Sequence, residues 1–186
     1  MRDAAGIAAF LAAAPALRGP LEALATLRLP DAWIGAGFIR NAVWDALCGL
    51  PFGSNPPGDV DAVWFDRTRA LPAIDAGLEA TLRQACPGAT WSVTNQARMN
   101  GCNGDLPYAD TRDAIAHWPE TATAIAARLT TRGVEVLAPH GVADLLGLVV
   151  RPTPRFVAEP AKRAIIAGRV AEKAWQARWP GLTLAP

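Results

Sequence analysis

The segment from residue 33 to residue 65 constrains the fold more than any other part of the chain. Residues 33–37 are apolar or small, which predicts a buried strand that ends in a glycine turn at Gly37. Residues 39–50 repeat apolar side chains at the spacing of a helix. A loop with three prolines and two glycines follows over residues 51–58, and an alternating run over residues 59–65 predicts a second strand. We therefore expect a β-α-β unit whose glycine turn and second strand meet at one end.

Asp59 and Asp61 open the second predicted strand. Side chains alternate along a strand, so these two carboxylates project from the same face. Like charges this close repel each other, and a divalent cation between them removes the repulsion. Mg²⁺ takes oxygen ligands from one or two carboxylates together with substrate phosphates. The pair indicates a phosphate-handling site, with a turn or capping role as the alternative.

The remaining periodicities predict a small mixed sheet flanked by helices. Helices are expected at residues 4–16, 21–29, 71–85, 141–150 and 161–179, and strands at residues 91–96, 121–129 and 134–137. Residues 97–108 are expected to form a loop, and Asp110 to cap a short helix. This order is typical of an α/β or α+β fold with extra N- and C-terminal helices. We expect one domain, with N-terminal helices over 1–30, a core over 31–150 and a C-terminal helix over 151–186.

The charge balance bears on the class of partner. Eighteen basic and seventeen acidic residues give a net charge of +1, so the chain lacks the overall basic character of a dedicated nucleic-acid binder. Basic side chains do concentrate after residue 150, either as a guide for a polyanion or as a solvated helix face. With 51% hydrophobic and 19% charged residues, the composition indicates self-association as a homo-oligomer.

The cysteines and the apolar segments bear on the compartment. Cys48, Cys86 and Cys102 are widely spaced and only two histidines accompany them, which indicates neither a disulfide framework nor a structural zinc site. We therefore expect a cytoplasmic protein. The alanine-rich start follows helical spacing, and Asp3 distinguishes it from a secretory signal peptide. No apolar run approaches the length of about 20 residues that spans a bilayer, so we expect no membrane role.

Six short segments stand in an order that resembles a known family. They are Ala36-Gly37-Phe38-Ile39-Arg40-Asn41, Asp59-Val60-Asp61-Ala62-Val63-Trp64-Phe65-Asp66, Asn95-Gln96-Ala97-Arg98-Met99, Pro107-Tyr108, Trp118-Pro119-Glu120-Thr121 and Ala138-Pro139-His140-Gly141-Val142-Ala143-Asp144-Leu145. Together they resemble the bacterial nucleotidyltransferase-like family of largely uncharacterised proteins, within the polymerase-beta-type nucleotidyltransferase superfamily. The resemblance extends over residues 33–179.

This resemblance implies Mg²⁺-dependent transfer of a nucleoside monophosphate from a nucleoside triphosphate (NTP) to a hydroxyl acceptor. In that chemistry two Mg²⁺ ions hold the triphosphate, and the hydroxyl attacks the α-phosphorus in line with the leaving pyrophosphate. The acceptor is unidentified, and a small molecule is favoured over a nucleic acid. The resemblance assigns Asp59 and Asp61 to the metal. It assigns Gly37, Phe38, Arg40 and Asn41 to the phosphates, with Phe38 where the superfamily usually has serine or glycine.

The superfamily pattern also has a third carboxylate on a later strand, where this chain has Asn95. The resemblance therefore makes Asn95 the third expected catalytic residue, with Gln96 and Arg98 as substrate contacts. Glu135 and Asp66 are the alternative carboxylates. An amide cannot act as a general base. The rival hypothesis is therefore a nucleotide-binding or interaction module, of which a toxin- or antitoxin-like protein is one form, that keeps the fold without catalysis.

Overall fold

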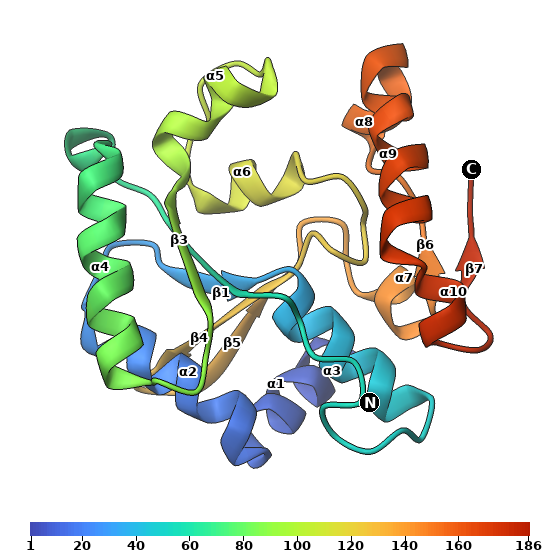
Figure 1. The fold of residues 1–186 in the computed structure, drawn as a ribbon, viewed down its shortest axis with the longest axis horizontal. Helices are drawn as coiled ribbons and strands as arrows, with labels where there is room; N and C mark the ends of the chain where they lie inside the picture. Colours follow the sequence, from blue (N-terminus) through green and yellow to red (C-terminus); the bar gives the residue numbers. More distant parts are fainter.

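The computed structural model describes residues 1–186 and contains a five-stranded mixed sheet (Figure 1). Its strands are β1 (Trp33–Gly35), β2 (Val60–Trp64), β3 (Trp91–Asn95), β4 (Ala126–Thr130) and β5 (Gly133–Leu137). They lie in the order β3-β2-β1-β4-β5, and only the β2–β3 pair is parallel. The predicted mixed sheet is confirmed, as is the hairpin of β4 and β5, although β4 begins at Ala126 rather than at residue 121.

The direction of β1 corrects the predicted β-α-β unit. β1 pairs with β2 antiparallel, and Gly35 lies opposite Asp61. In a parallel unit the end of the first strand and the start of the second would lie at opposite ends of the sheet. The antiparallel pairing instead places the turn after β1 directly beside Asp61. The parallel crossover in this sheet is made by β2, α4 (Pro72–Ala85) and β3.

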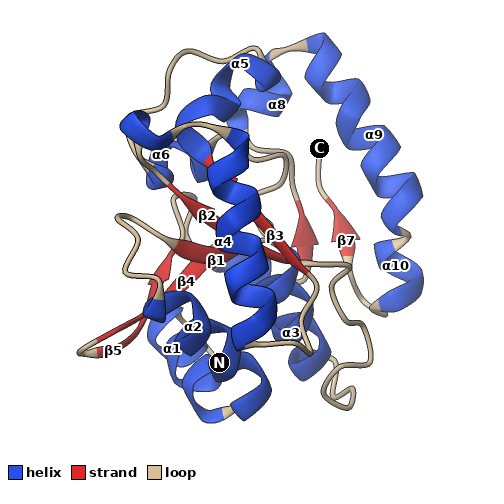
Figure 2. Cartoon of the chain, turned by 60° about the vertical axis from the view of Figure 1, so that its left-hand side comes forward, coloured by secondary structure: helices blue, strands red, loops and turns tan.

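Four helices cover one face of the sheet: α1 (Ala4–Ala13), α2 (Pro15–Thr26), α3 (Gly37–Leu47) and α4 (Figures 1 and 2). Their apolar side chains meet Ile34 and Ala62 in a core of 25 buried residues. The sequence predicted a break between helices at residues 16 and 21, and this is wrong. Pro15 begins α2, since proline fits the first turn of a helix, while Pro20 lies buried inside it.

The opposite face carries a smaller cluster of six buried residues, among them Trp33, Val63 and Ile115, with Trp118 packed against it. Helix α6 (Thr111–Ala116) contributes Ile115 to this cluster. Asp110 caps the helix as predicted, because its side chain accepts a 2.8 Å hydrogen bond from the Asp113 N–H. The segment predicted as a loop before α6 contains the short helix α5 (Met99–Asn103). Val63 and Asp61 share a strand and alternate together, so Asp61 belongs to this second face.

The C-terminal part is more broken than predicted. Helix α7 (Ala143–Leu146) ends early, and β6 (Val149–Val150) pairs with β7 (Thr183–Leu184). Helix α8 (Pro154–Ala158) follows β6. The helix expected over residues 161–179 divides into α9 (Pro160–Lys173) and α10 (Trp175–Arg178), because Ala174 adopts a left-handed conformation with φ 46° and ψ 42°.

Tryptophans anchor the end of this C-terminal part. Trp175 and Trp179 pack edge-on against Trp44 of α3, with ring centroids 6.4 Å and 4.9 Å apart. Helix α9 itself buries only Lys162. It stands at the side of the molecule opposite α4 (Figure 1).

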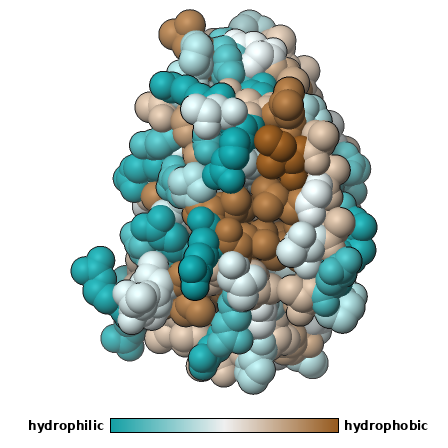
Figure 3. Space-filling view, turned by 90° about the vertical axis from the view of Figure 1, so that its left-hand side faces the viewer, coloured by the Kyte–Doolittle hydropathy of each residue, from teal (hydrophilic) through white to brown (hydrophobic).

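Apolar side chains gather over the face that carries α4 (Figure 3), and Leu71, just before this helix, is 68% exposed. Self-association through an apolar surface stays a prediction. No single helix combines the length and the apolar composition of a bilayer-crossing segment. The pair α1–α2 meets both criteria only when joined, and its two helices are bent by 93°.

Candidate functional site

Two cavities meet at Asp61. The smaller has a volume of about 250 Å³ and the larger about 420 Å³. Asp61, Ala36, Thr123 and Arg169 line both. Asp61 therefore lies at the junction of the two spaces, beside the turn between β1 and α3.

The smaller cavity brings together five residues that the sequence analysis selected. Gly37, Arg40 and Asn41 come from the start of α3, Asp59 directly precedes β2, and Asp61 lies in β2. Because β1 and β2 are antiparallel, the helix that follows β1 begins where β2 begins. Three basic side chains from the C-terminal helices complete the wall: Arg169, Lys173 and Arg178.

Arg40 is a buried cation without a carboxylate partner. It is 6% exposed, and its guanidinium donates to Thr123 Oγ1 at 2.7 Å and to Asn41 Oδ1 at 2.9 Å. Its Nε has no hydrogen-bond partner. The guanidinium lies over the Trp44 and Trp175 rings, 5.3 Å and 5.0 Å from their centroids. Burial lowers the pKa of Arg40 to about 10, against the attraction of Glu120.

Asp61 is an acid whose negative charge is disfavoured by its surroundings. Burial raises the pKa of its carboxyl group to about 6, and the neighbouring Asp59 adds to the rise while Arg40 opposes it. Asp59 itself is exposed. A cation bound between the two aspartates would remove both causes of the raised pKa, because it supplies the charge that burial withholds.

The C-terminal cations are held in place by other contacts. Arg169 donates to both carboxylate oxygens of buried Glu120, at 2.6 Å and 3.2 Å. Burial disfavours the charge of Arg169, but the hydrogen bond and charge of Glu120 outweigh it, so the pKa of Arg169 is raised. Arg178 donates to the Asn55 side chain and to the Pro56 carbonyl, next to Asp59. The sequence offered only the concentration of basic residues after position 150 as a signal for these three cations.

The turn before α3 presents backbone N–H groups. The first intrahelical bond runs from Arg40 N–H to Ala36 C=O, which leaves the N–H groups of Gly37, Phe38 and Ile39 unused by the helix. Ala36 has φ 54° and ψ −127°, a conformation that costs a residue with a Cβ atom more than glycine. Its own N–H donates to Ile125 C=O at 3.0 Å, which ties the turn to the sheet.

Asn95, which was expected as the third catalytic residue, does not line either cavity at Asp61. It pairs with Trp64 across the parallel strands and is fully buried on the α4 side. Its Oδ1 accepts from the N–H groups of Asp66 and Ala97, and its Nδ2 donates to the carbonyls of Asp66 and Arg69. These four bonds give Asn95 a structural role at the end of β3.

Arg98 is also directed away from the site. It forms an ion pair with buried Asp75 of α4, donating through Nε at 3.2 Å and Nη2 at 2.5 Å. The position on β3 that faces the larger cavity beside Asp61 is Thr94, and Gln96 follows it there. The face of β3 that lines this cavity is therefore the one opposite Asn95.

The other predicted residues lie outside the cluster. Phe38 is 5% exposed in the main core, so it contributes its backbone alone to the turn. Of the alternative carboxylates, Glu135 pairs with Arg128 on the β4–β5 hairpin, and Asp66 accepts from Thr68 and Arg69. Neither alternative carboxylate lines the two cavities at Asp61.

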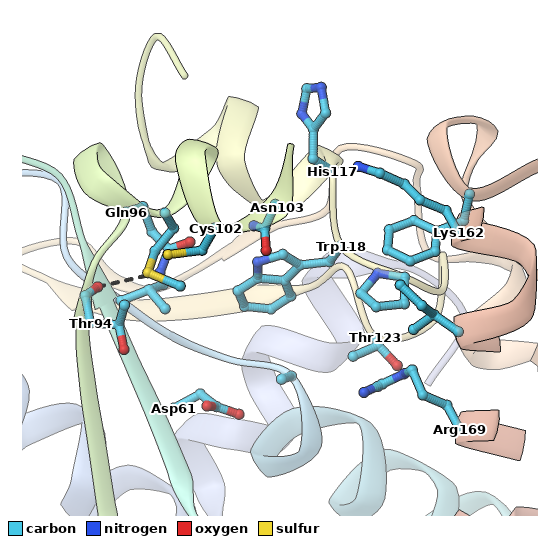
Figure 4. A pocket seen from close by; sticks show the side chains of 16 residues that line it. Asp61, Thr94, Gln96, Cys102, Asn103, His117, Trp118, Thr123, Lys162 and Arg169 are labelled. Carbon is cyan, nitrogen blue, oxygen red and sulfur yellow. Dashed lines mark hydrogen bonds between the residues drawn. The ribbon is translucent and has the colours of Figure 1, made fainter. Parts of the chain in front are cut away.

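The larger cavity has a mixed wall (Figure 4). Trp118 stands in its centre, with Asp61 and Thr94 on one side and the end of α5 above. Phe156 and Ile165 of the C-terminal helices close another side. Of the hydrogen bonds among the residues drawn, only that from Gln96 to Thr94 C=O appears. Other polar side chains on this wall bond to residues outside it: Asn103 to Tyr108, Lys162 to Asp105 and Arg169 to Glu120.

A family model described as Nucleotidyltransferase matches residues 22–184. The chain belongs to this nucleotidyltransferase family. A comparison with curated protein sequences gave no significant match. The family confirms the resemblance stated from the sequence and identifies the chain as an NTP-using nucleotidyltransferase, with the mixed sheet that the sequence predicted.

Solved structures place this nucleotidyltransferase among CCA-adding enzyme head domains by fold. An NMR structure described as a CCA-adding enzyme head domain matches with a TM-score of 0.86 and 29% identity, covering 100% of this chain and 97% of the other. A CCA-adding enzyme bound to CTP matches with a TM-score of 0.58 and 14% identity, covering 100% of this chain and 44% of the other. The Thermotoga maritima CCA-adding enzyme with tRNA matches at 0.57 and 16%, with 100% and 43% coverage. The chain thus spans less than half the length of these two complete enzymes, which show the fold alone.

Proposed function

We propose that this nucleotidyltransferase binds a Mg²⁺–NTP complex in the 250 Å³ cavity and transfers a nucleoside monophosphate to a hydroxyl group presented at Asp61. The observation that carries the proposal is Arg40. A buried guanidinium without a carboxylate partner is costly, and an anion beside it removes the cost. The similar CCA-adding enzymes include complexes with CTP and with ATP, which supports an NTP as that anion.

The residues present fit one Mg²⁺ ion held jointly with the triphosphate. Asp59 and Asp61 provide two carboxylates at one cavity wall, and Mg²⁺ commonly takes one or two carboxylates and completes its coordination with phosphates and water. Burial and the neighbouring Asp59 raise the pKa of Asp61, although Arg40 opposes the rise, and a bound cation would favour the ionised carboxylate further. When bound, Mg²⁺ would neutralise charge on the phosphates and help the pyrophosphate to leave.

The protein groups then have separate roles. The N–H groups of Gly37, Phe38 and Ile39 and the guanidinium of Arg40 bind phosphate oxygens, as the N-terminus of an 11-residue helix favours. Lys173 and Arg178 neutralise the leaving pyrophosphate from the other wall. The acceptor oxygen forms a bond to the α-phosphorus as the bond from that phosphorus to the bridging oxygen breaks. Pyrophosphate leaves with the electron pair, and the hydroxyl proton passes to solvent.

A nucleotide-binding module without turnover is the second candidate. Thr94 occupies the β3 position that faces the site, and no three aspartate, glutamate, histidine or cysteine side chains are grouped so that they could hold a metal ion together. A hydroxyl group there can bind a ligand but does not take a proton at neutral pH. The two candidates share the NTP site and differ in pyrophosphate release.

Calorimetry with Mg²⁺ and each of the four NTPs tests the site. We expect wild type to bind at least one NTP, and the double variant Asp59→Asn, Asp61→Asn to lose the Mg²⁺-dependent part of the binding. Glu135→Gln removes an exposed carboxylate on the hairpin and serves as the matched control. Binding that survives the double variant contradicts the metal role of the pair. A pyrophosphate-release assay with cell extract as the source of acceptor then separates transfer from binding alone.

A further inference from the structure

We infer that the 420 Å³ cavity is the acceptor site of this nucleotidyltransferase, and that it takes a small, uncharged alcohol with an aromatic or apolar body. The inference rests on the proposed function, because it requires the triphosphate to occupy the smaller cavity. Three features of the larger cavity support it: its direction from Asp61, its charge and its wall.

The direction follows from the geometry of phosphoryl transfer. The attacking and leaving oxygens lie roughly in line on opposite sides of the phosphorus. The basic side chains that suit pyrophosphate, Lys173 and Arg178, line the smaller cavity only. With the α-phosphorus beside Asp61, the attacking oxygen must come from the side away from them. The larger cavity opens from Asp61 on that side and shares Ala36 and Thr123 with the smaller one.

The charge of the larger cavity disfavours a polyanionic acceptor. Its wall has two permanent cations, and both are already paired. Lys162 Nζ lies 2.7 Å from Asp105 Oδ1, and Arg169 is bound to both oxygens of Glu120. Affinity for a nucleic-acid strand depends on basic side chains that neutralise its phosphates. The ion pairs leave none free here, so an uncharged molecule is the ligand that this wall accepts.

The wall also fits an aromatic ring beside a hydroxyl group. Trp118, Phe156 and Ile165 supply apolar surface, and Trp118 stands between α9 and the β2–β3 side of the cavity in Figure 4. Thr94, Gln96 and Asn103 add a few uncharged polar groups. A volume of about 420 Å³ lies within the roughly 300–1,000 Å³ of small-molecule sites, which are mostly apolar with few polar groups. When the aromatic ring of the alcohol packs against Trp118, the hydroxyl group of the alcohol is directed to Asp61.

The group transfer balances without further reactants. The oxygen of the alcohol forms the new bond to the α-phosphorus, and the bond from that phosphorus to the oxygen bridging the β-phosphate breaks. The products are a nucleoside monophosphate ester of the alcohol and pyrophosphate. The hydroxyl proton passes to solvent.

Titration of ¹⁵N-labelled protein with 2-phenylethanol tests the cavity, because each of the seven tryptophans gives its own indole N–H signal. We expect the Trp118 signal to shift and the signal of buried Trp44 to stay. Ile165→Trp fills the cavity from a side chain that is 51% exposed, so the variant should fold and should bind 2-phenylethanol about tenfold more weakly. The control Val157→Trp adds the same side chain at a 47% exposed position that lines neither cavity, and should leave the affinity unchanged.

Further arms separate the possible ligands. 2-Phenylethyl phosphate and a short single-stranded RNA should shift Trp118 less than the alcohol does. A stronger response to either, or no response to a panel of uncharged aryl alcohols, overturns the inference. Equal affinity of Ile165→Trp and wild type for the alcohol also overturns it.

Calorimetry with Mg²⁺–NTP distinguishes this failure from failure of the proposed function. Ile165→Trp should retain wild-type NTP affinity, because Ile165 does not line the smaller cavity. If wild type binds no NTP, the proposed function fails and the acceptor role falls with it, even where Trp118 responds to the alcohol. If NTP binds and the alcohol does not, only the acceptor site is refuted.

Discussion

Replacing Asp61 by asparagine should stabilise the metal-free protein at neutral pH, although it removes a proposed metal ligand. Burial and Asp59 raise the pKa of Asp61 from 3.8 to about 6. One pH unit corresponds to about 1.4 kcal/mol, so ionised Asp61 costs the fold about 3 kcal/mol above pH 6. Asparagine has nearly the same shape and carries no charge. We expect a gain of about 2–3 kcal/mol in the free energy of unfolding at pH 7.5, or roughly 4–10 °C in Tm.

The pH dependence gives this prediction its sign. The pKa of Asp61 is higher in the folded than in the unfolded chain, so the folded protein binds more protons between pH 3.8 and about 6. Wild-type stability therefore falls as pH rises through that window relative to the Asp61→Asn variant. The two proteins should be equally stable near pH 3.5 and should differ fully above about pH 6.5.

Urea unfolding with EDTA at several pH values measures the difference. Asp59→Asn removes only the second cause of the raised pKa and should give a smaller gain. Glu135→Gln removes a carboxylate outside the two cavities and should not reproduce the gain at pH 7.5. The reasoning is refuted if Asp61→Asn is less stable than wild type at pH 7.5, or if its gain is the same at every pH. Adding Mg²⁺–NTP should stabilise wild type and not the variant, which would reverse their order.

Three further predictions address other contacts. Arg40→Met should lower NTP affinity by about ten- to a hundredfold in calorimetry with the fold retained by circular dichroism, since a charge-assisted hydrogen bond contributes about 1.5–3 kcal/mol. Gly35→Ala should lower stability by about 1–3 kcal/mol in urea, because its Cβ would lie 2.7 Å from the Trp118 ring, whereas Gly19→Ala in open space should raise it by about 0.5–1 kcal/mol. Asp105→Asn should cost about 3–5 kcal/mol at pH 7, because Asp105 is 2% exposed at its side chain and two basic groups lose their partner. Although burial opposes it, hydrogen bonds lower the pKa of Asp105, so this loss should be complete above about pH 3.8 and should disappear in thermal melts only as pH falls through the lower pKa of the folded state.

The sequence predicted the elements around the site because their signals are local. Residues 33–65 gave the strand, the turn, the helix and the second strand in the right order, and the structure places β1, α3 and β2 there. The direction of β1 relative to β2 could not be predicted from local signals. A strand, a helix and a strand are compatible with either pairing, and the choice depends on Ala126 and its neighbours in β4, which pair with β1 from the other side.

The sequence also did not predict which face of β3 lines the cavity. Trp91, Val93 and Asn95 alternate with Ser92 and Thr94, and both sets contain residues that suit burial or a site. Asn95 ends the more apolar set, and that set packs on α4. A polar residue at the end of an apolar face is as well explained by capping a turn, which is what its bonds to Asp66 and Ala97 do.

The sequence did not predict which cations line the site, for a different reason. Arg169 lies 108 positions after Asp61, and in its helix only Val170 packs against the main core. Helix α9 buries Lys162 alone, so its place is determined by ion pairs to Asp105 and Glu120. Both partners are buried acids that appear unremarkable in the sequence. The two ion pairs thus do two things at once: they hold α9 across the site, and they consume the charges of Lys162 and Arg169. The cations without an acidic partner lie at the Arg40 end, and this division of charge supports the proposal that the smaller cavity binds the triphosphate and the larger one does not.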